Sequence, residues 1–120
     1  IHKNMKNLLE LKQVLINTKA RINEKPELFD YDSYNNNGVS GCVLFHLAKE
    51  LDIEINEKTT GREMFDEVVS MFIVINIPLL IHLRNKVLYF SEDIKGMSKK
   101  EQVQLANKKI DEFINKLNYE

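Results

Sequence analysis

The chain has 120 residues, 43% of them hydrophobic and 29% charged, and its formal net charge is −1. This composition predicts one globular domain, residues 1–120, and excludes an intrinsically disordered chain. The balanced charge argues against nucleic acid as a partner, because proteins that bind it usually carry a strong basic excess. A single cysteine excludes an intrachain disulfide and with it a disulfide-stapled secreted scaffold.

The most hydrophobic run, from Met71 to Leu83, is interrupted by Asn76, Pro78 and His82. It is too short to span a bilayer, and the polar, basic residues at the start of the sequence do not resemble the apolar part of a signal peptide. We therefore expect a cytoplasmic protein that does not enter a membrane.

The first predicted helix runs from Asn4 to about Ile22. Asn4 is the expected N-cap, and Pro26 ends the helix because it disfavours helical geometry at Lys25. The inner face repeats at three- and four-residue steps and consists of Met5, Leu8, Leu11, Leu15 and Ile22.

A polar loop is predicted over residues 27–38, and it contains the aromatic residues Phe29, Tyr31 and Tyr34. These rings either anchor the loop to the core or face a ligand. The sequence leaves both interpretations open.

The second predicted helix begins near Ser40, whose hydroxyl is the expected cap. It follows the glycine-containing stretch from Asn35 to Cys42, and its inner face consists of Leu44, Leu47, Ala48 and Leu51. Beyond it, Ile53 and Ile55 alternate with acidic residues, which predicts an extended connection with one face covered.

Two further helix starts are predicted by capping boxes, Thr60 with Glu63 and Ser98 with Glu101. In this motif the first side chain and the fourth each accept a hydrogen bond from the other's backbone N–H. The inner residues that follow are Met64, Phe65, Val68, Val69 and Phe72 in the third helix and Val103, Ala106, Ile110, Phe113, Ile114 and Leu117 in the last.

Between these helices, a short helix is predicted from Pro78 to Asn85, since proline is favoured in a first turn. Residues 73–75 and 87–90 are β-branched or aromatic enough for short strands, so a small hairpin stays open. The predicted fold is therefore mostly α, a compact domain of four to five helices.

Tests for known chemistry give no active site. The stretch from Gly38 to Cys42 lacks the spacing and the lysine of a phosphate-binding loop, and the run from Asp30 lacks the glycine and glutamate of a calcium loop. Cys42 and His46, four residues apart, would form half of a soft-metal site, and a helix N-terminus would lower the pKa of Cys42. We therefore expect that the protein is not an enzyme and that it binds no cofactor or metal ion.

Three groups of residues remain as candidates for binding. The acidic set is either a solvated face or a contact surface for a basic protein, and consists of Asp52, Glu54, Glu57, Glu63, Asp66 and Glu67. The alternative is a small-molecule or metal site formed by Tyr31, Tyr34, Cys42 and His46. A weaker option is nucleic-acid binding through Lys6, Lys12, Lys19 and Arg21.

Two segments, Phe29 to Tyr34 and Asn37 to Phe45, resemble a loose group of small uncharacterised phage and bacterial proteins. That group has an F-D-x-x-x-W/Y segment followed by a C-G-T-x-x-C-type helix start. Asn37 stands where the group has its first cysteine and Phe45 where it has a second glycine, so a functional cysteine pair is excluded here. The resemblance implies a mobile-element origin and supplies no activity. Our leading hypothesis is a non-enzymatic, phage-encoded interaction protein that binds a host protein through the acidic set.

Overall fold

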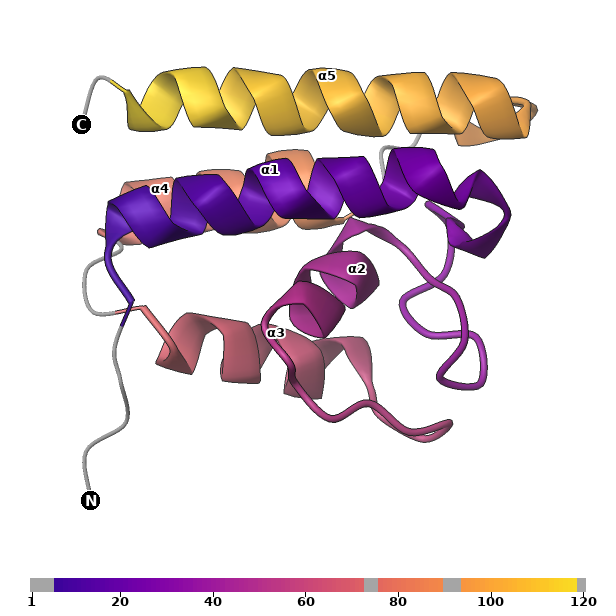
Figure 1. Ribbon diagram of the computed structural model, residues 1–120, viewed down its shortest axis with the longest axis horizontal. Coiled ribbons are helices and arrows are strands. Elements are labelled where there is room, and N and C mark those ends of the chain that lie inside the picture. The colour runs from indigo at the N-terminus through magenta and orange to yellow at the C-terminus, as the bar shows by residue number, and fades with distance from the viewer. Residues whose placement is uncertain (1–5, 73–75, 90–93, 119–120) are drawn as a thin grey trace.

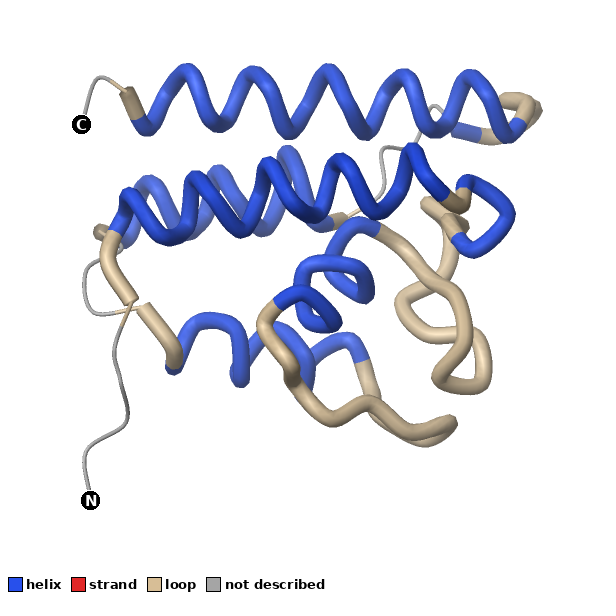
Figure 2. Tube along the Cα trace, viewed as in Figure 1, coloured by secondary structure: helices blue, strands red, loops and turns tan. Residues whose placement is uncertain are grey.

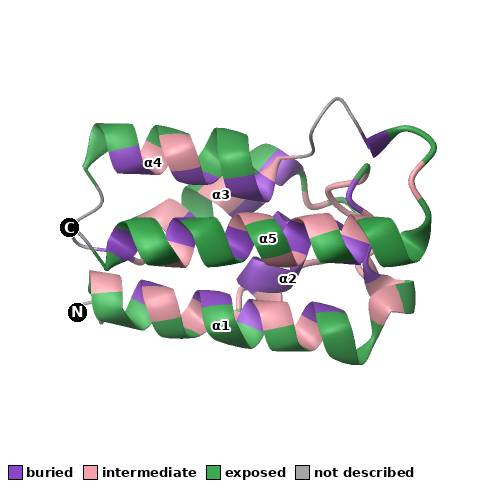
Figure 3. Cartoon of the chain, turned by 90° about the horizontal axis from the view of Figure 1, so that it is seen from above, coloured by how far each residue is buried: buried purple, intermediate pink, exposed green. Residues whose placement is uncertain are grey.

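Two long amphipathic helices, α1 (Leu8–Glu24) and α5 (Lys99–Leu117), pack along each other in the computed structural model. The structure describes residues 6–72, 76–89 and 94–118. Seen from above, α5 runs between α1 and α4 (Ile77–Leu83) (Figure 3). The ring of His82 on α4 stacks on that of Phe113 on α5, with ring centroids 5.7 Å apart.

The remaining helices, α2 (Val43–Glu50) and α3 (Gly61–Ser70), lie below this layer (Figure 1). α2 packs against both α1 and α3. A single turn of 3₁₀-helix, η1 (Pro26–Leu28), follows α1, and a π-helical turn, η2 (Arg84–Leu88), extends α4. The predicted mostly helical fold is confirmed, with five α-helices and no sheet in the described residues (Figure 2).

The centre of the fold is α2, because all six side chains from Val43 to Ala48 are buried. A helix that is apolar all round has no face to offer to water and is stable only when enclosed. Its partners are the inner faces of α1 and α3, which pack against it from two sides. The charged residues Lys49 and Glu50 close the helix where it reaches the surface.

The start of α1 differs from the prediction. Asn4 lies outside the described residues, and the helix begins at Leu8 with Asn7 as its N-cap. The Asn7 side chain accepts the Glu10 N–H at 2.9 Å, and the Glu10 carboxylate accepts the Asn7 N–H at 3.2 Å. This capping box satisfies two backbone N–H groups at the start of the helix. The predicted end before Pro26 is confirmed.

The prediction of Ser40 as the cap of α2 is wrong. The helix begins at Val43, with Cys42 at the N-cap position. Ser40 instead closes a turn, since its carbonyl accepts the Asn36 N–H at 2.8 Å and its hydroxyl accepts the Asn36 side-chain amide at 3.2 Å. A local turn has taken the hydroxyl that capping would have used.

The capping boxes at Thr60 and Ser98 are both confirmed, as is the inner stripe of α5. The helix predicted over 78–85 is confirmed by α4 and η2. A strand at 87–89 is wrong, because Val87 and Leu88 belong to the π-helical turn and are buried there. The possible strand at 73–75 and residue 90 lie outside the described residues.

Candidate functional site, an acidic groove

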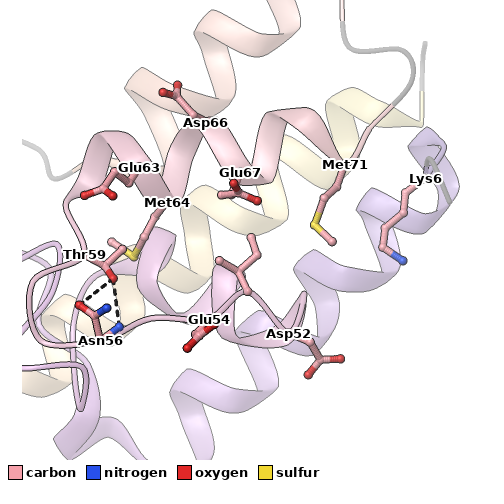
Figure 4. Close-up of a pocket in the computed structure, with 11 residues that line it drawn as sticks. Lys6, Asp52, Glu54, Asn56, Thr59, Glu63, Met64, Asp66, Glu67 and Met71 are labelled. Atoms are coloured by element: carbon pink, nitrogen blue, oxygen red, sulfur yellow. Dashed lines mark hydrogen bonds between the residues drawn. The ribbon is translucent and has the colours of Figure 1, made fainter. Parts of the chain in front are cut away.

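An open groove of about 970 Å³ lies between α3 and the connection that follows α2 (Figure 4). We call it the acidic groove. It is lined by Lys6, Asp52, Ile53, Glu54, Asn56, Thr59, Glu63, Met64, Asp66, Glu67 and Met71. Five of the six acidic residues selected from the sequence therefore meet at one concavity, although they come from two separate segments. The sixth, Glu57, is exposed but does not line it.

One wall of the groove is the extended connection after α2. The predicted alternation is confirmed there, since Ile53 and Ile55 are half-buried while Asp52 and Glu54 are exposed. The apolar side chains hold the segment against the core, and the pleat turns the carboxylates to the other side. Asp52 has φ 57°, a left-handed conformation that aspartate tolerates better than most residues.

A hydrogen-bonded turn fixes the end of this connection. The Asn56 N–H donates to the Thr59 hydroxyl at 3.0 Å, and the Lys58 N–H donates to the Asn56 side-chain oxygen at 2.8 Å. The Asn35 side chain also donates to the carbonyls of Asn56 and Thr59. The turn sets the direction from which the chain enters α3.

The other wall is the outer face of α3. Met64 and Val68 point inward and are buried, whereas Asp66 and Glu67 are exposed. Glu63 also caps the helix, because its carboxylate accepts the Thr60 N–H at 3.1 Å. The helical period that buries the apolar residues thus places the acidic ones in the groove.

Some lining residues of the groove, among them Ile53 and Lys6, are not in the acidic set selected from the sequence. Ile53 had a signal in the alternation of its segment. Lys6 had none, because it reaches the groove only through folding: its N–H donates to the Met71 carbonyl at 2.7 Å. This bond ties the residue before α1 to the end of α3. Met71, which is half-buried, adds polarizable apolar surface beside the carboxylates.

The aromatic residues of the 27–38 loop are anchored to the core. Tyr31 is buried, and its hydroxyl donates to the Val87 carbonyl at 3.1 Å. Burial raises the pKa of Tyr31. Tyr34 is half-buried and packs edge to face on Tyr89, with ring centroids 5.3 Å apart. The anchoring interpretation accounts for these contacts, and a ligand could reach Tyr31 only if the core opened.

Cys42 and His46 are also enclosed. Burial raises the pKa of the Cys42 thiol to about 11, outweighing the backbone N–H groups at the start of α2 that lower it. The predicted lowering of the Cys42 pKa is therefore wrong. Burial lowers the pKa of His46 to about 4. The part of the chain that the structure describes brings together no three side chains able to hold a metal ion.

The basic residues of α1 mostly contact other parts of the protein. Lys19 pairs with Asp111 of α5, and Arg21 pairs with Glu50 of α2, each at 2.9 Å. Lys12 donates to the Asn118 side chain at 2.9 Å. These contacts direct the cationic groups toward neighbouring elements rather than into one stripe along the surface.

No helix in the described ranges is both long and apolar enough to cross a membrane. Comparisons of the chain with family models, with curated proteins and with solved structures gave no match. The geometry and charge of the acidic groove are therefore the basis for a functional proposal.

Proposed function

We propose that this protein is a non-enzymatic interaction module that binds a basic partner protein at the acidic groove. The observation that carries the proposal is that five acidic residues, from two segments of the chain, line one open groove. A concave surface of one sign concentrates the electrostatic field and favours oppositely charged ligands.

Charge complementarity would act mainly on the rate and specificity of association. Lys6 is the one basic side chain among the lining residues, so a lysine- or arginine-rich segment would meet mostly carboxylates. The half-buried side chains of Ile53 and Met71 offer it apolar contacts as well. Such a combination suits a protein segment better than a small cation, because it rewards both charge and apolar area.

We further propose that the protein is a phage-encoded inhibitor of a host defence or replication protein and acts in the cytoplasm. It rests on the resemblance of segments 29–34 and 37–45 to small phage and bacterial proteins. Many enzymes that act on nucleic acid have a basic binding face. The carboxylates of the groove would present to such a face the negative charge that phosphates otherwise supply.

The test is a charge-reversal variant of the groove, Glu54→Lys, Asp66→Lys and Glu67→Lys. Glu63 is left unchanged because it caps α3, and Asp52 because its left-handed φ of 57° would strain a lysine. The matched control, Glu24→Lys, Glu27→Lys and Glu112→Lys, makes the same change in net charge at exposed sites outside the groove.

Both variants and the wild-type chain would be used to capture proteins from a host lysate, with identification by mass spectrometry. We expect a basic protein that is retained by the wild type and the control and is lost with the groove variant. Its affinity should fall as salt rises. Equal capture by all three proteins would contradict the proposal that the partner binds at the acidic groove.

A further inference from the structure

The segment that links η1 to α2 is held by a short set of hydrogen bonds. The Asp30 N–H donates to the Gly41 carbonyl at 2.9 Å, and the Gly41 N–H donates to the Leu28 carbonyl at 3.2 Å. The ring Nε2 of His46, on α2, lies 2.9 Å from the same Leu28 carbonyl. We propose that His46 is an acid-sensitive clasp that holds residues 28–41 against α2 and releases them when its ring is protonated.

The surroundings of His46 suit a neutral ring. The side chain is only 2% exposed, and it lies among the rings of Phe29 and Phe45, whose centroids are 6.1 and 5.1 Å away. With its proton on Nε2, the neutral ring donates to Leu28. Its other nitrogen, Nδ1, is buried and forms no hydrogen bond with the described residues.

A second proton on this ring would be poorly accommodated. It would add a charge in an apolar site and a donor on Nδ1 that needs an acceptor. The Leu28 and Gly41 carbonyls both favour the protonated ring, and the Gly41 carbonyl also accepts the Asp30 N–H at 2.9 Å. A protonated ring would share the Gly41 carbonyl with the Asp30 N–H. Burial nevertheless outweighs both carbonyls, so protonation favours the form in which the ring reaches water.

The charged groups around the site do not offset this cost. Arg21 of α1 disfavours the imidazolium, although its guanidinium is paired with Glu50 of α2. Lys99 of α5 donates to the Phe29 carbonyl, which places another cation beside the segment. The Asp30 carboxylate helps to raise the pKa of Cys42 and forms no ion pair with His46. Burial is the dominant effect, lowering the pKa of His46 to about 4.

The direction of the pH effect follows from linkage. An exposed histidine has a pKa of about 6.5, so above that value the ring is neutral in both closed and open forms and protonation does not favour opening. As the pH falls from about 6.5 toward about 4, the open form binds one more proton than the closed form. The opening equilibrium constant then rises by up to about tenfold per pH unit, on the order of a hundredfold over this range.

Cys42 provides a direct readout, because it is the only cysteine of the chain and is buried where the segment meets α2. Its modification by dithiodipyridine, which reacts with thiols in mild acid, would be timed from about pH 7 to about pH 4. Rates are divided by those of the urea-unfolded chain at the same pH, which removes the intrinsic pH dependence of the thiol. Far-UV circular dichroism follows the helices in parallel.

The proteins compared are the wild type, His46→Gln and His82→Gln. Glutamine can still donate to Leu28 but does not titrate, and His82 is a second histidine, only partly buried and stacked on Phe113 of α5. We expect the relative reactivity of Cys42 to rise on the order of a hundredfold in the wild type and in His82→Gln while the helical signal persists. In His46→Gln the rise should be absent or several-fold smaller.

An equal rise in His46→Gln, or reactivity that appears only when the helical signal is lost, would overturn the proposal. If His46→Gln does not fold, NMR of the wild type decides. We then expect the His46 ring and the amides of Asp30 and Gly41 to shift with one common midpoint well below 6.5. A ring that titrates without those amides would contradict the clasp. None of these outcomes depends on binding at the acidic groove.

Discussion

The region around α2 and the acidic groove use polar residues in opposite ways. Around α2, the residues with the most reactive side chains, Tyr31, Cys42 and His46, are enclosed by apolar neighbours. Burial holds each of them in its neutral form. In the groove, Asp66, Glu67 and their neighbours gather where solvent and a partner can reach them. Residue type alone therefore misleads: burial decides which polar groups are available.

The first prediction tests how strongly the α2 region depends on packing. Phe45→Ala removes a ring that is 1% exposed and should lower the free energy of unfolding by about 3–5 kcal/mol, through lost transfer energy and a cavity. Urea denaturation followed by circular dichroism measures the change. Leu9→Ala, at a side chain that is 73% exposed, is the control and should change it by less than about 0.5 kcal/mol. Similar losses for both would mean that α2 is not the centre of the core.

The second prediction concerns acid stability. Because the pKa of His46 is lowered to about 4 in the folded protein, its contribution to stability is complete above about pH 6.5 and is lost as the pH falls toward about 4. The loss amounts to roughly 3 kcal/mol at 1.36 kcal/mol per pKa unit. Urea midpoints at several pH values, compared between the wild type and His46→Gln, isolate this share from that of the carboxylates. Parallel pH curves for the two proteins would contradict it.

The third prediction tests the close approach at Gly41. A Cβ at this position would lie 2.7 Å from the Phe45 Cβ and 2.7 Å from the Tyr34 carbonyl oxygen, so the backbone must shift in Gly41→Ala. We expect a loss of about 1–3 kcal/mol, measured by thermal and urea unfolding. Val39→Ala, in the same segment but exposed, should be close to neutral. An unchanged midpoint in Gly41→Ala would show that the segment yields easily.

The smallest effect on stability is expected in the groove. Asp66→Lys and Glu67→Lys replace exposed side chains on the outer face of α3, and each should change the free energy of unfolding by less than about 0.5 kcal/mol. Partner capture should nevertheless be reduced, since both residues line the groove. A large loss of stability here would reverse the comparison, because the groove would then be a structural element. Urea denaturation of the two single variants provides the measurement.

Much of the fold could be read from the sequence because its signals are local. The capping boxes at Thr60 and Ser98 involve residues three positions apart, and the stripe of α5 repeats within one helix. Similar patterns predicted the alternation of Ile53 and Ile55. In each case neighbours in the chain already supply the hydrogen bonds or the apolar face, so tertiary contacts only reinforce the local preference.

Where several local solutions compete, tertiary packing made the choice. Val87 and Leu88 have strand propensity, yet they lie in a π-helical turn whose Val87 carbonyl accepts the Tyr31 hydroxyl. At Ser40 the competing solution is itself local, because the turn with Asn36 holds this residue outside α2. Propensities of a fraction of a kcal/mol per residue are easily outweighed by burial of a whole side chain.

The sequence by itself determined that the fold is mostly helical, and it located α1, α3 and α5 through their apolar stripes and, for α3 and α5, their capping boxes. Only the tertiary structure decided that Asp52 and Glu54 line the same groove as Lys6 and the acidic residues of α3. It also decided that Cys42 and His46, the residues most suggestive of chemistry, belong to the core. The physical reason is that local periodicity sets the face on which a residue lies, whereas its exposure depends on what distant segments pack against that face.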